Sequence, residues 1–80
     1  MSVEDKQIAR LVQRELNRRQ TLDVTGVKIA VTRAVCTLSG VIKPSTGQFI
    51  RPAEEEKALL ETARRIPGLK GMYIEVHWEG

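Results

Sequence analysis

The residue types that most often carry chemistry are scarce in this chain, which has one histidine, His77, and one cysteine, Cys36. Glu75 and His77 lie two residues apart in an alternating segment, so they would share one face of a strand. Two ligands leave a metal site incomplete, and His77 has no nucleophile or carboxylate at a recognisable catalytic spacing. The sequence therefore predicts no enzyme, no bound metal and no cofactor, and His77 is expected to be an exposed strand residue.

Cys36 lies within a run of β-branched and other apolar residues. An unpaired cysteine in such a pattern is typically a small buried residue, and we expect this in preference to a reactive thiol. Because a single cysteine has no partner within its own chain, a disulfide-linked dimer is the other alternative.

The motif Gly68-Leu69-Lys70-Gly71 matches the GXXG loop of KH nucleic-acid-binding domains. In a KH domain that loop joins two helices and clamps the nucleic-acid backbone. Here the motif leads into an alternating, strand-like segment that begins at Met72. A helix stop followed by a turn explains the glycines better, so KH-like nucleic-acid binding is only a remote alternative.

A basic ridge on the first predicted helix is the main candidate for a binding surface. Its cations recur every fourth residue, away from the apolar stripe of that helix, and they are Lys6, Arg10, Arg14 and Arg18. Such a ridge can meet anionic lipid headgroups, or it can be the solvated face of an ordinary helix. The net charge of +3, from 13 basic and 10 acidic residues, is a mild bias that fits either interpretation.

The second candidate surface is the loop predicted at residues 43–52, which is rich in proline and other turn-forming residues. Phe49 and Ile50 are adjacent apolar residues inside it, and they either cover the edge of the core or contact a partner. Lys43 and Arg51 lie near the two ends of this loop. A lipid-binding or partner-binding face would therefore combine Lys6, Arg10, Arg14, Arg18, Lys43, Phe49, Ile50 and Arg51.

The elements that must position these residues follow from hydrophobic periodicity. We expect a helix at about 3–19, strands at about 27–33 and 35–42, a helix at about 53–66 and a strand at about 72–78. The second helix should bury the stripe Leu59, Leu60, Ala63 and Ile66. Eighty residues suit one α+β domain of order αββαβ. A right-handed crossover predicts a three-stranded mixed sheet with both helices on one face.

Three local features of this fold are expected to need special geometry. Ser2 and Asp5 form a capping-box pattern that would start the first helix. Arg33-Ala34 must connect two strands without Gly, Asn or Asp, so we expect either a longer loop or a bulge. Gly40 lies inside a strand, and a helix packed closely across it would explain the glycine.

Several segments together resemble the BON domain, a family named for bacterial osmotic-stress and nodulation proteins. They are residues 22–28, the strand 35–40 and the helix exit 63–72. The most specific parts are Leu38-Ser39-Gly40 and the turn formed by Pro67, Gly68, Leu69, Lys70 and Gly71. The chain departs from the family in its single copy, its longer 43–52 loop and the absence of glycine at Arg33-Ala34.

The resemblance implies a non-catalytic module that attaches to phospholipid surfaces or other envelope components. The alternative is protein–protein interaction, including a homodimer, through the open face of the sheet. No small-molecule substrate is indicated. Residues 1–6 lack the apolar core of a secretory signal, so a cytoplasmic location is expected, although the resemblance also allows the periplasm for a chain cut from a longer protein.

Overall fold

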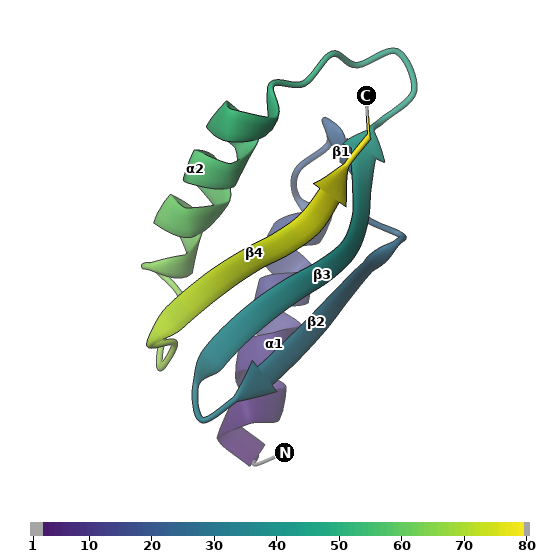
Figure 1. Ribbon diagram of the computed structural model, residues 1–80. Coiled ribbons are helices and arrows are strands. Elements are labelled where there is room, and N and C mark those ends of the chain that lie inside the picture. The colour runs from purple at the N-terminus through teal and green to yellow at the C-terminus, as the bar shows by residue number, and fades with distance from the viewer. Residues whose placement is uncertain (1–2, 80) are drawn as a thin grey trace.

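The computed structural model describes residues 3–79 and has the predicted α+β architecture (Figure 1). Its elements are α1 (Val3–Asn17), β1 (Leu22–Asp23), β2 (Val27–Thr32), β3 (Val35–Pro44), α2 (Pro52–Ala63) and β4 (Gly71–Trp78). The predicted order of two helices and three strands is present, and the two-residue strand β1 is an addition to it. Ser2, the first half of the expected capping box, lies outside the described residues.

β3 is the central strand of a mixed sheet. It pairs antiparallel with β2 and parallel with β4, and β1 pairs antiparallel with the last two residues of β3. α1 packs against β2 and α2 packs against β4, on the same side of the sheet. Figure 1 shows α1 passing behind the sheet, so the face toward the viewer carries no helix.

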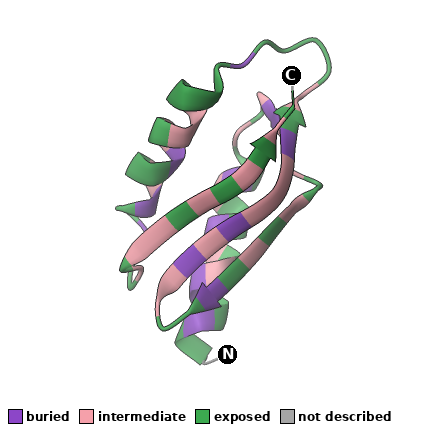
Figure 2. Ribbon diagram, in the orientation of Figure 1, coloured by how far each residue is buried: buried purple, intermediate pink, exposed green. Residues whose placement is uncertain are grey.

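The core forms between that sheet face and the helices. α1 contributes Ile8, Val12 and Leu16, which recur every fourth residue, and β3 contributes alternate residues, as the banding in Figure 2 shows. The buried apolar residues are Ile8, Val12, Leu16, Leu22, Val31, Cys36, Leu38, Ile42, Ile50, Leu59, Ala63 and Ile66. Leu60 is 41% exposed, so the expectation that it joins the buried stripe of α2 is wrong.

The turn between β2 and β3 uses only two residues. Arg33 and Ala34 have φ values of 52° and 64°, and the strand register continues to the pair Thr32–Val35. A two-residue turn with positive φ at both positions matches the right-handed twist of a hairpin. The expectation of a longer loop or a bulge is therefore wrong.

Asp5 explains how this turn forms without glycine or asparagine. Its carboxylate accepts hydrogen bonds from the backbone N–H of Arg33 at 3.2 Å and of Ala34 at 3.0 Å, and Asp5 itself is buried. Two charge-assisted bonds to the turn amides offset the cost of holding side-chain-bearing residues at positive φ. The first turn of α1 thus fixes the hairpin.

Gly40 is approached by backbone, as expected, but the approaching group belongs to Gly26 and not to a helix. Gly40 has a φ of 94°, and a β-carbon added there would lie 2.1 Å from the carbonyl oxygen of Gly26. The same oxygen accepts a hydrogen bond from Val41 N–H at 3.1 Å. Gly26 and Gly40 therefore let the chain cross from β1 to β2 while staying against β3.

α1 ends at Asn17, two residues before its expected end, and this frees Arg19 to reach α2. The Arg19 guanidinium binds the Glu55 carboxylate through two nitrogens, with the Nε to Oε2 distance at 3.0 Å, and Thr21 donates its hydroxyl to Glu55 at 3.4 Å. Glu15, one helical turn before Arg19, pairs with Arg18 at 3.2 Å. One ion pair therefore joins the end of the first helix to the start of the second.

Replacing Glu55 with alanine is expected to lower the free energy of unfolding by about 2 kcal/mol, because the half-buried Arg19 loses a charged partner. The Glu55 side chain is 13% exposed, whereas that of Glu54 is 71% exposed and lies 3.5 Å from Arg51. Glu54→Ala is therefore the matched control, and its effect should be below about 0.5 kcal/mol. Urea unfolding measures both, and equal effects would contradict the assignment.

Candidate functional site

The basic face of α1 consists of Lys6, Arg10 and Arg14, and all three residues are exposed. The buried stripe of the helix is formed by Asp5, Ile8, Val12 and Leu16. At 100° per residue the three cations lie on the side opposite that stripe, and four-residue spacing sets them about 6 Å apart along the helix axis. The helix therefore presents a continuous row of positive charge to solvent.

The acidic residues of α1 lie off this line. Glu4 borders a hollow shared with Pro67 and Gly68, and Glu15 borders one shared with Thr62 of α2. Glu15 thus lies on the side of α1 that faces α2, Glu4 faces the segment that follows α2, and Asp5 is buried against the turn. No acidic residue interrupts the basic face within the described part of the helix.

The other expected cations are each close to a carboxylate. The ion pairs are Arg18–Glu15 at 3.2 Å, Lys43–Asp23 at 3.9 Å and Arg51–Glu54 at 3.5 Å. Hydrogen bonds from the Thr25 hydroxyl and backbone N–H, with a smaller contribution from Lys43, lower the pKa of Asp23 and favour its charged form. Within residues 3–79 no ion pair includes a cation of the basic face.

The two apolar residues of the long loop separate in the structure. Phe49 is 85% exposed, whereas Ile50 is 9% exposed and packs in the core, so Ile50 is not part of a binding tip. Ser45 N–H donates to the Thr21 carbonyl at 2.9 Å, which holds the start of the loop beside the segment that follows α1. Phe49 therefore belongs to the end of the molecule where α1 ends.

The open face of the sheet carries the exposed residues of β4. Tyr73 is 61% exposed, and Glu75 and His77 are exposed beside it on β4. Across residues 3–79, no cluster of three or more His, Cys, Asp or Glu side chains has an arrangement that could hold a metal ion. This face therefore offers hydrogen-bonding groups and an aromatic ring.

The GXXG segment connects α2 to β4 and does not join two helices. Gly68 has a φ of 83°, a backbone conformation that favours glycine, and Leu69 N–H bonds to the Ile66 carbonyl at 3.2 Å. α2 itself ends at Ala63, three residues before its predicted end, so the expectation that Pro67 and Gly68 stop the helix is wrong, and a series of tight turns leads from Arg64 to β4. The helix–loop–helix arrangement that grips nucleic acid in KH domains is not formed here.

Cys36 is fully buried, as expected for a structural residue, and burial raises the pKa of its thiol to about 11. At pH 8 we expect a disulfide reagent to label Cys36 in the native protein only as fast as the fold opens and exposes the thiol. The same reagent should label the urea-unfolded protein at once. The raised pKa also stabilises the fold below about pH 9, a contribution that is lost as the pH rises through about 11. Rapid stoichiometric labelling of the native protein would show that the thiol is accessible.

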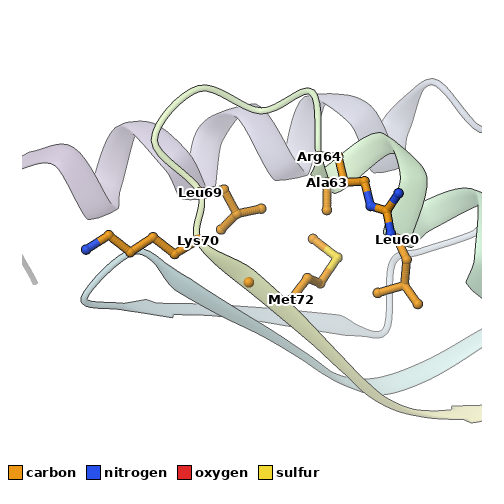
Figure 3. A pocket seen from close by; sticks show the side chains of 7 residues that line it. Leu60, Ala63, Arg64, Leu69, Lys70 and Met72 are labelled. Atoms are coloured by element: carbon orange, nitrogen blue, oxygen red, sulfur yellow. The ribbon is translucent and has the colours of Figure 1, made fainter.

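The sequence did not predict a hollow between the end of α2 and the start of β4, which we call the α2–β4 hollow (Figure 3). Its volume is about 280 Å³, and its lining residues are Leu60, Ala63, Arg64, Leu69, Lys70, Gly71 and Met72. The adjacent residues Leu59 and Leu60 give a partial indication of this hollow. The apolar stripe of an amphipathic helix buries one of two adjacent leucines more fully than the other, so the second remains at the surface.

No family model, curated protein or solved structure matches this chain. The resemblance to the BON domain therefore rests on the sequence motifs, and the binding surfaces rest on the geometry given above. Within the part of the chain that the structure describes, no helix has the length and apolar character needed to cross a membrane.

Proposed function

We propose that this domain is a non-catalytic attachment module that binds anionic phospholipid surfaces through the basic face of α1. The supporting observation is that Lys6, Arg10 and Arg14 stand exposed in one line with no acidic residue among them. Each lysine or arginine near an anionic membrane contributes about 1 kcal/mol, so the line supplies about 3 kcal/mol. The resemblance to the BON domain implies a ligand of the same kind.

Phe49 adds an apolar contact to this proposal. Its ring is almost fully exposed in the loop held beside the segment that follows α1. Aromatic rings partition into the interface between headgroups and acyl chains, where they complement cationic residues. Reversible attachment by combined charge and apolar contact suits a surface with one short line of cations.

Neutralising two cations of the basic face is expected to weaken binding to anionic vesicles. Arg10→Gln combined with Arg14→Gln removes about 2 kcal/mol of attraction, which is about a thirtyfold loss of affinity. The matched control is Arg64→Gln combined with Arg65→Gln, which removes the same charge from exposed positions beyond α2. Co-sedimentation with vesicles rich in phosphatidylglycerol, at low salt, measures both variants.

Two results would contradict this function. Equal binding of the wild-type domain to anionic and zwitterionic vesicles would exclude electrostatic attachment. An equal loss of affinity in the control variant would show that net charge alone, and not the basic face of α1, governs binding. Release of the wild-type domain from anionic vesicles as the salt concentration rises would support electrostatic attachment.

A further inference from the structure

We propose that the outer edge of β4 and the α2–β4 hollow together form a second docking site, which accepts an extended segment of a partner protein. The segment would add to the sheet as a further strand beside β4. Its side chains would alternate between the open face of the sheet and the hollow, and it would combine apolar with acidic residues. This site lies on elements other than the proposed lipid-binding face of α1.

The free edge of β4 is the first observation. Within residues 3–79, β4 pairs only with β3, so the backbone groups on its other side meet no strand. β4 is eight residues long and contains no proline. Long regular edges of this kind are normally covered or interrupted, because they offer a template for another strand.

The position of α2 is the second observation. α2 packs against β4 on the same side of the sheet as α1, and Figure 3 shows its last turn facing the start of β4 across the hollow. The inward residues of β4 are consequently half-buried, and they are Met72, Ile74, Val76 and Trp78. A strand added beside β4 would cover Leu60, which is 41% exposed and lines the hollow.

The chemistry of the hollow defines the segment further. Leu60, Leu69 and Met72 supply apolar walls, and Arg64 and Lys70 are the charged residues that line it. Its volume of about 280 Å³ lies below the usual range for small-molecule pockets, so it suits side chains better than a separate ligand. An apolar side chain next to a carboxylate would satisfy both the walls and the cations.

Gly71, at the start of β4, fits this use. Its φ is not in the positive region, and a β-carbon added to it would have no atom within 4 Å. Neither backbone conformation nor internal packing therefore requires glycine here, in contrast to Gly40. A strand glycine with open space beside it allows another chain to approach closely.

Selection of random displayed peptides on the wild-type domain tests the proposal. We expect the selected peptides to alternate apolar residues and to contain aspartate or glutamate. Leu60→Glu and, separately, Arg64→Glu combined with Lys70→Glu should each lower peptide affinity at least about tenfold. The matched control, Lys57→Glu combined with Arg65→Glu, makes the same charge change outside the hollow and should leave affinity unchanged.

The location of binding is tested by hydrogen exchange and by a charge swap. Bound peptide should protect amides of β4, and the variant with Arg64→Glu and Lys70→Glu should prefer a peptide whose acids are replaced by lysine. Because Leu60, Arg64 and Lys70 are exposed, these variants should stay folded. A further variant, Gly71→Val, fills the open space beside the start of β4 and should also lower peptide affinity.

Failure to enrich acidic–apolar peptides, unchanged affinity of Leu60→Glu, or protection confined to β2 would each overturn the proposal. A dimer held together through β4 would also overturn it. Peptide binding that survives Arg10→Gln with Arg14→Gln would show that this site is separate from the basic face.

Discussion

Gly40→Ala is expected to leave little folded protein at room temperature. The new β-carbon would lie 2.1 Å from the carbonyl oxygen of Gly26, which is a backbone atom held against β3, and the φ of 94° is itself unfavourable for alanine. Backbone strain of this kind costs about 1–3 kcal/mol before the clash is counted. A domain of this size has a stability of only about 3–5 kcal/mol, so the total cost is comparable with the whole stability.

Circular dichroism and urea unfolding measure this effect, with Gly71→Ala as the matched control. Gly71 lies in the same sheet, with open space around the added carbon and no positive φ. Gly71→Ala should therefore change the free energy of unfolding by less than about 1 kcal/mol. If the two alanine variants were equally stable, the close approach of Gly26 to Gly40 would be wrong.

The second large effect is expected for Asp5→Ala, which should lower the free energy of unfolding by about 2–3 kcal/mol. The substitution removes the acceptor of two backbone hydrogen bonds at the turn formed by Arg33 and Ala34. Both turn residues would then hold positive φ without the charge that stabilises them. Glu4→Ala, at an exposed neighbouring position, is the control and should have little effect.

A double-mutant cycle separates the turn from other roles of Asp5. Arg33→Asn with Ala34→Gly installs residues that favour this turn, and it should stabilise the wild type by up to about 1 kcal/mol. Asp5→Ala should then lower the free energy of unfolding by less in the variant with Arg33→Asn and Ala34→Gly than in the wild type. Identical costs in both backgrounds would show that Asp5 does not act through the turn.

The order of elements could be predicted because each one shows its own periodicity. The spacing of Ile8, Val12 and Leu16 identifies the buried side of α1, and alternation does the same for β3 and β4. The two-residue turn could not be predicted, because its stabilising group is Asp5 in the first turn of α1, far from the turn in sequence. Local propensity at residues 33 and 34 favours a different turn, and a contact distant in sequence overrides it.

The candidate site likewise has features that could be predicted from the sequence and features that could not. The exposure of Lys6, Arg10 and Arg14 follows from helical spacing alone. The partners of Lys43 and Arg51 depend on how β1 and the long loop are placed, so pairing with Asp23 and Glu54 was not foreseen. The exposure of Leu60 and the α2–β4 hollow depend on where α2 lies relative to β4, which periodicity does not encode.

The most direct test of attachment through α1 is an amide chemical-shift titration of the domain with anionic bicelles. We expect the largest shifts at Lys6, Arg10 and Arg14, with further shifts at Phe49, and we expect them to vanish with zwitterionic bicelles or at high salt. Shifts confined to β4 and the open face of the sheet, or shifts of equal size with zwitterionic lipid, would contradict attachment through the basic face of α1.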